Sequence, residues 1–121
     1  MQTTNIYEDF HRRRTEGNDL ILAEDNLVLK RFFNLDTRCY EEGALGRKTK
    51  ELLGLAASAV LRCNDCIFYH IEQAKLAGAS REEIIESLNV ALVVGGSIVI
   101  PHLRAAFAAI DELFGFRETT D

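Results

Sequence analysis

The stretch CNDCIFYHIEQAKLAGASREEIIESLNVALVVGG, residues 63–96, carries the strongest secondary-structure signals in the chain. Its first half is rich in good helix formers and contains no proline. Gly78 then suits the left-handed position that often follows the last residue of a helix. Ser80 and Glu83 form the S-x-x-E pattern of a capping box, which starts a new helix. The stretch therefore predicts one helix over about 63–77 and a second that runs to about Val94, with a sharp turn between them.

Helical character extends over nearly the whole chain outside this stretch. Asp25 or Asn26 can cap a helix over about 26–40, and another helix is expected over about 47–62. Pro101, the only proline, suits the first position of a last helix. No sustained alternation of polar and apolar residues indicates a strand. The sequence thus predicts an all-α protein.

The length bounds the number of domains. A chain of 121 residues with an apolar fraction of 47% can bury one core and is too short for two ordinary domains. We expect a single helical domain at residues 21–116. Residues 1–20 are expected to form an N-terminal arm that is poorly ordered or docks on a neighbour, and residues 117–121 a C-terminal tail.

Charge and hydropathy exclude several kinds of partner. The net charge of −5 argues against nucleic acid or an anionic membrane, since both attract basic patches. The one basic cluster, residues 11–14, is flanked by acids and is expected to be solvated surface. The longest apolar stretch, residues 88–100, is shorter than the roughly 20 residues that cross a bilayer. No signal peptide is visible, so we expect a cytoplasmic protein.

Two cysteines and a histidine stand close together in CNDCIFYH. At about 100° per residue, Cys66 lies about 60° and His70 about 20° from Cys63 around a helix, so the three share one arc. Ala74 falls in the same arc and Ile67 beside it, which predicts that the three side chains lie on the inward, apolar face. In a reducing compartment such a cysteine pair is more often catalytic or metal-binding than a structural staple.

A redox interpretation uses all three residues. The thiolate is the reactive form of cysteine, and a helix N-terminus favours it through its dipole and free N–H groups. His70, one turn after Cys66, can accept or relay the proton. Oxidation by a peroxide gives a sulfenic acid, which a neighbouring thiol condenses to a disulfide. Asp65 adds a negative charge in the same turn, but the angular count directs its side chain away from the cysteines.

Other interpretations stay open on the residues alone. Free cysteines are often inert core residues, as is expected for Cys39. Structural zinc usually needs four ligands, so the pair and one His would need a fourth from Glu51, His102 or water. Covalent haem is disfavoured, because that motif places a His directly after the second Cys, where Ile67 stands here.

From Gly43 to Leu113 the sequence resembles the carboxymuconolactone decarboxylase / alkylhydroperoxidase D (AhpD-like) family. The match begins with GALGRKTKELLGLAASAV, and CNDCIFYH fits the family pattern C-x-x-C-I-x-x-H. The following EQAKLAGASREEIIESLNVALVVGG is similar to the family's A-x-x-x-G-A-[ST]-x-E-E-I stretch. The resemblance implies an AhpD-like helical bundle that assembles into homo-oligomers, usually trimers or hexamers. Gly95 and Gly96 would allow close helix approach.

The resemblance also implies a thiol-disulfide oxidoreductase with alkylhydroperoxidase-like, antioxidant activity. Peroxidase members use a Glu, two Cys and a His as a proton-relay system, and the matching positions here are Glu51, Cys63, Cys66 and His70. By that analogy Cys66 forms the sulfenic acid, and Cys63 donates a proton and then resolves it to a disulfide. His70 and Glu51 relay the proton away from Cys66. Such a peroxidase needs no metal, haem or flavin, and a dithiol protein or small thiol re-reduces the disulfide.

The sequence departs from the best-studied peroxidase members at Asp65, where they carry a second His. The lactone decarboxylases of the family generally lack the cysteine pair, so its presence favours redox chemistry. Two alternative functions remain. A decarboxylase-like acid/base enzyme acting on a small lactone or hydroxy acid would keep its activity without both cysteines. A non-catalytic helical assembly or metal-binding module would show no disulfide cycling.

Overall fold

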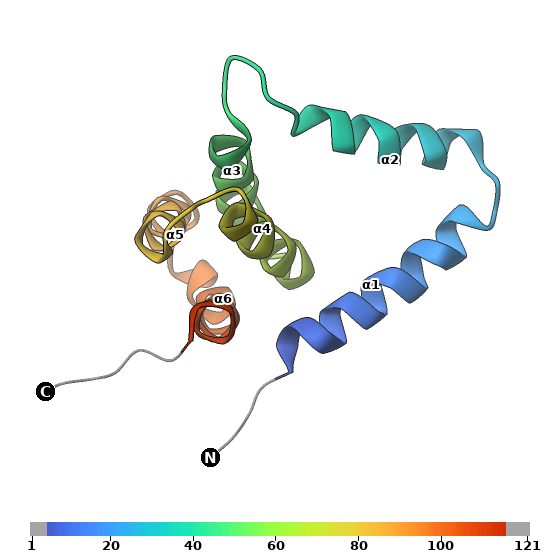
Figure 1. The fold of residues 1–121 in the computed structure, drawn as a ribbon. Helices are drawn as coiled ribbons and strands as arrows, with labels where there is room; N and C mark the ends of the chain where they lie inside the picture. The colour runs from blue at the N-terminus through green and yellow to red at the C-terminus, as the bar shows by residue number, and fades with distance from the viewer. Residues whose placement is uncertain (1–4, 116–121) are drawn as a thin grey trace, which may run out of the picture.

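The computed structural model describes residues 5–115, and its elements are six α-helices and one short 3-10 helix (Figure 1). The helices are α1 (Ile6–Leu22), α2 (Leu27–Cys39), α3 (Arg47–Val60), α4 (Asn64–Leu76), α5 (Arg81–Gly95) and α6 (Ile100–Phe114), with η1 (Ser97–Val99) between α5 and α6. No strand occurs over these residues, so the all-α prediction is confirmed. The expected tail at 117–121 lies outside the described residues, as do residues 1–4. No described helix is both long enough and apolar enough to cross a membrane.

Helices α3 to α6 pack together and hold most of the core (Figure 1). Each contributes one apolar stripe at helical spacing, such as Ile67, Ile71 and Ala74 on α4. The apolar residues with no exposed surface are Leu55, Ala59, Ile67, Ile71, Ala74, Ile84, Val99, Ala106, Ala109 and Ile110. Helix α4 lies against α3 on one side and α6 on the other, so the cysteine motif at its start is carried by the best-packed part of the fold.

Three of the predicted capping and turn residues lie at the observed ends of the helices. The Asn26 side chain caps α2 by accepting a hydrogen bond from the N–H of Leu29. Gly78 has a φ of 97°, which only glycine adopts without strain. Ser80 and Glu83 form the complete capping box of α5. These boundaries are therefore set where backbone groups at the helix ends find hydrogen-bond partners within a few residues.

The N-terminal arm, expected to be poorly ordered or to dock on a neighbour, forms helix α1 from Ile6 onward and packs on α4 and α6 of the same chain. Tyr7 and Phe10 are buried, and both rings pack edge-on against Phe68 of α4. The Tyr7 hydroxyl donates a 2.7 Å hydrogen bond to the carbonyl of Phe68. The Glu112 carboxylate on α6 accepts from the N–H groups of Ile6 and Tyr7, which caps the helix at its positive end. These contacts order a segment whose own helix signals are weak.

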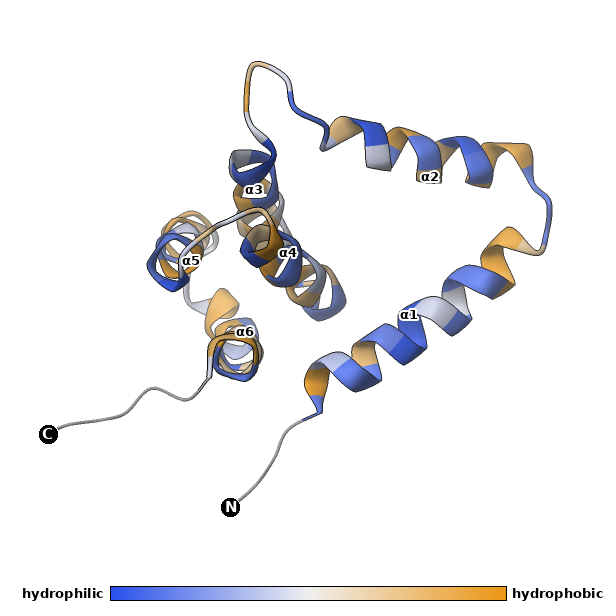
Figure 2. Cartoon of the chain, viewed as in Figure 1, coloured by the Kyte–Doolittle hydropathy of each residue, from blue (hydrophilic) through white to orange (hydrophobic). Residues whose placement is uncertain are grey.

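Helix α2 lies apart from the other helices, as Figure 1 shows, and no residue of it is buried. Apolar residues nevertheless recur along it (Figure 2). Its exposed large apolar side chains are Leu27, Val28, Leu29, Phe32 and Leu35. Cys39, expected as a core residue, is the last residue of α2 and is exposed, because this helix packs on no part of the core.

Candidate functional site

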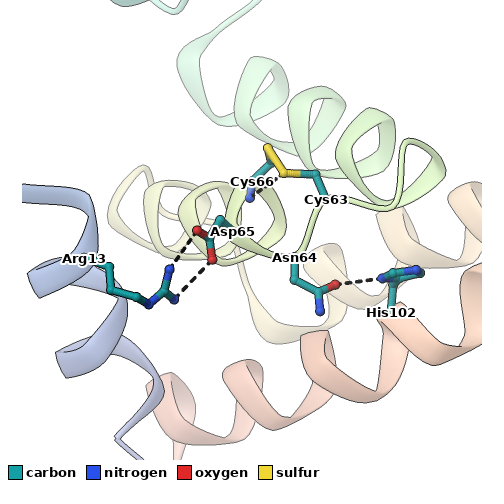
Figure 3. Close-up of a disulfide and its surroundings, with 6 residues drawn as sticks. All are labelled: Arg13, Cys63, Asn64, Asp65, Cys66 and His102. Atoms are coloured by element: carbon teal, nitrogen blue, oxygen red, sulfur yellow. Dashed lines mark hydrogen bonds and ion pairs between the residues drawn. A yellow bond between two sulfur atoms is a disulfide. The ribbon is translucent and has the colours of Figure 1, made fainter. Parts of the chain in front are cut away.

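Cys63 and Cys66 form a disulfide at the start of α4 (Figure 3). Cys63 is the N-cap of the helix, with an extended backbone, and its sulfur accepts a 3.2 Å hydrogen bond from the N–H of Cys66. Arg62, with a φ of 62°, turns the chain sharply just before it. The helix N-terminus therefore favours negative charge on the sulfur of Cys63 in particular.

The exposure of the two cysteines differs from the predicted inward position. Cys66 is exposed and Cys63 is half-buried, while the buried stripe of α4 is formed by Ile67, Ile71 and Ala74. The prediction was wrong because Cys63 precedes the helix, so a helical angle does not apply to it. Cys66 lies beyond the edge of the buried stripe. As a result Cys66 is open to a reactant from solvent.

His70 and Glu51 make direct contact between α4 and α3. His70 Nδ1 lies 2.8 Å from Glu51 Oε1, and the two side chains are 12% and 1% exposed. An ionised carboxylate only accepts hydrogen bonds, so this contact requires the proton on Nδ1 and leaves Nε2 to accept a further proton. Arg47 Nε lies 3.9 Å from the other oxygen of Glu51. The structure thus joins two of the four predicted site residues into one buried unit.

Two tyrosine rings flank the imidazole of His70. The ring centroids of Tyr69 and Tyr40 lie 5.2 and 5.6 Å from that of His70. Burial, followed by the nearby charge of Glu51, raises the pKa of both hydroxyls, so they stay protonated at neutral pH. The sequence analysis missed both residues. Tyr69 could have been noticed as the neighbour of His70 in the motif, whereas nothing local marks Tyr40.

Two cavities adjoin this unit. The first, of about 370 Å³, is lined by residues that include Phe10, Arg14, Cys66, Tyr69 and His70. The second, of about 360 Å³, is lined by residues that include Tyr40, Arg47, Glu51 and Tyr69. His70 lines the first cavity with Cys66, and Glu51 lines the second. Their hydrogen bond therefore joins a residue that lines the cavity of the exposed cysteine to a residue that lines the second cavity.

Asp65, between the two cysteines, points away from the disulfide, as the angular count predicted (Figure 3). The guanidinium of Arg13 on α1 holds its two carboxylate oxygens at 2.9 and 3.2 Å. Arg13 also donates to Asp9 through Nε, at 2.8 Å. The basic cluster expected to be solvated surface thus supplies a counter-charge to the one acidic residue inside the cysteine motif.

The proposed fourth zinc ligands are engaged elsewhere. His102 Nδ1 lies 2.8 Å from the side-chain oxygen of Asn64 (Figure 3), and Glu51 contacts His70. Over residues 5–115, no three His, Cys, Asp or Glu side chains are grouped so that they could hold a metal ion. The zinc alternative therefore has no ligand set in that part of the chain.

Comparison with known proteins places the site in a family context. Residues 26–112 match the model of the carboxymuconolactone decarboxylase family. Two crystal structures of a Thermotoga maritima protein are similar to this chain, with TM-scores of 0.86 and 0.83 at 56% and 55% identity. The first covers 89% of this chain and 95% of that one, and the second covers 88% and 90%. The second is described as a carboxymuconolactone decarboxylase family protein with a suggested part in the antioxidative response.

Two more distant proteins are also similar. A carboxymuconolactone decarboxylase family protein from Legionella pneumophila, solved in its apo form, has a TM-score of 0.78 at 27% identity and covers 95% of this chain and 100% of its own. An uncharacterized protein of the cox locus of Paracoccus denitrificans is 33% identical over 84 residues, which are 69% of this chain and 76% of that protein.

Proposed function

This chain belongs to the carboxymuconolactone decarboxylase family, and on that premise we propose that it is a thiol-disulfide oxidoreductase that reduces organic hydroperoxides. The observation that carries the proposal is the Cys63–Cys66 disulfide, whose exposed cysteine lines one cavity with His70. The antioxidative role suggested for the Thermotoga maritima relative agrees with this chemistry.

The first step is the oxidation of Cys66. His70 Nε2 takes the proton of the Cys66 thiol, and the thiolate attacks the terminal oxygen of the hydroperoxide. The O–O bond breaks, Cys66 becomes a sulfenic acid, and the leaving alkoxide takes up a proton to give an alcohol. The exposure of Cys66 supports this assignment, because a hydroperoxide in the cavity can reach it, whereas Cys63 is half-buried.

The second step is the formation of the disulfide. The sulfur of Cys63 attacks the sulfur of the Cys66 sulfenic acid, the S–O bond breaks, and the hydroxyl leaves as water after taking the proton of the Cys63 thiol. The hydrogen bond from the N–H of Cys66 to the Cys63 sulfur favours the thiolate that makes this attack. One hydroperoxide and two thiols thereby give one alcohol, one water and one disulfide.

The third step is reduction by a dithiol. A thiolate of the reductant attacks the sulfur of Cys66, the more exposed of the two residues, and Cys63 leaves as a thiolate that the helix N-terminus stabilises. The second thiol of the reductant then attacks the first sulfur of the reductant in the mixed disulfide. This forms a disulfide within the reductant and releases Cys66 as a thiolate. Two molecules of a small monothiol achieve the same result.

The buried His70–Glu51 contact supports a proton route away from the reaction. A proton taken from Cys66 by Nε2 makes the imidazole positive, and the 2.8 Å contact with the Glu51 carboxylate stabilises that charge. Glu51 also lines the second cavity. The proton can leave through that cavity without crossing the cavity that holds the hydroperoxide.

We also propose that the chain acts as a homo-oligomer, a trimer or a hexamer. The support is the number of exposed apolar side chains on two separate parts of the fold. Phe32 on α2 is 65% exposed and Val93 on α5 is 84% exposed, each with apolar neighbours. Soluble monomers rarely expose contiguous apolar surface of this kind, and a second copy would bury it.

Mass spectrometry of the reduced protein after one equivalent of cumene hydroperoxide tests the redox proposal. The experiment is done in a Cys39→Ser background, because this substitution removes the exposed free thiol from disulfide exchange. We expect a Cys63–Cys66 disulfide in this background and, with Cys63→Ser added, a sulfenic acid on Cys66 that dimedone traps. Thiols that stay reduced contradict the proposal. They would favour the acid/base alternative, whose activity on a small lactone or hydroxy acid survives the loss of both cysteines.

A further inference from the structure

Gly54, in the middle of α3, lies directly against the imidazole of His70. A Cβ atom built on Gly54 would lie 2.7 Å from His70 Cε1 and 2.9 Å from each ring nitrogen. Carbon atoms in contact approach to about 3.5–4.0 Å, so no other residue fits at this position while the ring stays where it is. The edge of the ring that carries both nitrogens therefore rests on the backbone of α3.

The ring is flanked by two tyrosines and borders the first cavity. Tyr69 meets it edge-on, and Tyr40 covers it at a ring-centroid distance of 5.6 Å. The side chain of His70 is only 12% exposed. A side chain at position 54 would displace the imidazole from its place on α3 and disturb its contact with Glu51, one turn earlier on the same helix.

The backbone of α3 gives no other reason for a glycine here. Gly54 lies in a regular helical segment, and its φ is outside the left-handed region. Glycine is the poorest helix former after proline, so it is unfavourable in the interior of this helix. The space beside His70 is the one local feature that requires it.

We propose that Gly54 is a positioning residue of the site. By having no side chain it seats the His70 imidazole on α3, which sets Nδ1 on Glu51 and leaves Nε2 for the proton of Cys66. The effect on turnover rests on the proposed redox function, whereas the effect on the His70–Glu51 contact does not. The inference can therefore be tested even if the redox function proves wrong.

The test compares Gly54→Ala with two other glycine variants. Gly95→Ala is the matched overpacking control, because its Cβ would lie 2.5 Å from Val99 Cγ2, away from His70. Gly43→Ala is the neutral control, since its nearest neighbour is the flexible end of Lys50 at 3.5 Å. The readouts are the ¹⁵N chemical shifts of the His70 ring, the rate and pH profile of disulfide formation with cumene hydroperoxide, and the melting temperature.

We expect Gly54→Ala alone to change the His70 ring shifts and the pH profile, and to slow disulfide formation about tenfold to hundredfold. Gly95→Ala should lower the melting temperature without changing the ring shifts. Adding Glu51→Gln to the Gly54→Ala variant should slow disulfide formation little further, because both changes disrupt the same contact between His70 and Glu51. Unchanged ring shifts in Gly54→Ala, or rate losses that multiply in the double variant, would overturn the inference. A wild-type protein inert to hydroperoxide would overturn the redox function only, since the ring shifts still decide the role of Gly54.

Discussion

His70 Nδ1 meets Glu51 Oε1 at 2.8 Å, although the two residues are 19 positions apart and lie on different helices. Glu51 is 1% exposed, and a buried carboxylate is costly unless a partner compensates for its lost hydration. Its near partners are the imidazole of His70 and, at 3.9 Å, the guanidinium of Arg47. The pair is therefore a single electrostatic unit, and a change at either end should be felt at the other.

Glu51→Gln should slow the oxidation of Cys66 while preserving the fold. The amide has the shape of the carboxylate but cannot stabilise a positively charged imidazole, so we expect disulfide formation to slow by about 10²-fold. Stopped-flow measurement of thiol loss with cumene hydroperoxide gives the rate. Glu86→Gln, at an exposed position on α5, is the control and should behave as wild type. An unchanged rate in Glu51→Gln would remove Glu51 from the proton route.

Arg13→Gln and Asp65→Asn should change cysteine reactivity in opposite directions. Without Arg13, the charge of Asp65 stands beside the cysteines uncompensated and disfavours the thiolate. In Asp65→Asn that negative charge is gone, so the thiolate is favoured and the cysteines should react faster. Both charges are exposed and screened by water, so we expect modest changes in reactivity of about twofold to fivefold.

Alkylation of the reduced Cys39→Ser protein by iodoacetamide at neutral pH measures this reactivity. Arg12→Gln, one residue earlier on α1 and paired with Asp9 but not with Asp65, is the control. Because both partners of the Arg13–Asp65 pair are about half exposed, the free energy of unfolding should change little. Slower alkylation in both variants would show that the pair acts by holding α1 in place and not through charge.

Tyr7→Phe should destabilise the protein, mainly below pH 10. The variant loses the hydrogen bond from the Tyr7 hydroxyl to the Phe68 carbonyl, which costs about 0.5–1.5 kcal/mol. Burial raises the pKa of Tyr7 above its ordinary value of 10.0. The stabilisation by the neutral hydroxyl is therefore complete below the unfolded-state pKa and is lost as the pH rises from there toward the folded-state pKa.

Urea denaturation at pH 7 and pH 11 checks this prediction. The difference in unfolding free energy between wild type and Tyr7→Phe should be smaller at pH 11. Tyr69→Phe is the control at pH 7, since the Tyr69 hydroxyl has no hydrogen-bond partner over residues 5–115. A difference that grows with pH would contradict the burial of a neutral hydroxyl.

Phe32→Asp and Val93→Asp should each reduce the size of the assembly without unfolding the chain. Both side chains are exposed in the single chain, so a charge there costs little within one copy but much in an apolar interface. Light scattering after size-exclusion chromatography measures the mass, and circular dichroism the helix content. Arg31→Asp, next to Phe32 on α2, is the control for added negative charge. A monomeric wild type would contradict the proposed homo-oligomer.

The boundaries of α2 to α6 could be predicted closely because their causes are local. Asn26 and the Ser80–Glu83 capping box satisfy N–H groups within their own first turns, and Gly78 adopts a conformation that other residues avoid. The spacing of Cys63 and Cys66 places them within reach of one disulfide for the same reason. Such signals depend on a few neighbouring residues and can be recognised in the sequence alone.

The order of α1 could not be predicted, because its stabilising partners are far away in the sequence. Tyr7 packs on Phe68, 61 positions on, and Glu112 caps the helix from 105 positions away. The exposure of Cys66 and Cys39 likewise depends on where neighbouring helices pack and not on helical spacing. A predicted angle around a helix says which side chains share a face, but not which face is covered.

The sequence by itself determined the helices of the bundle, the cysteine pair and the family to which the chain belongs. Tertiary structure alone decided how the site is built: the contact of His70 with Glu51, the space left by Gly54, the tyrosines around the imidazole and the arginine on Asp65. The physical reason is the range of the interactions. Helix caps and turns are fixed by hydrogen bonds between groups only a few residues apart in the sequence. Burial and side-chain partners arise only when separate helices pack together.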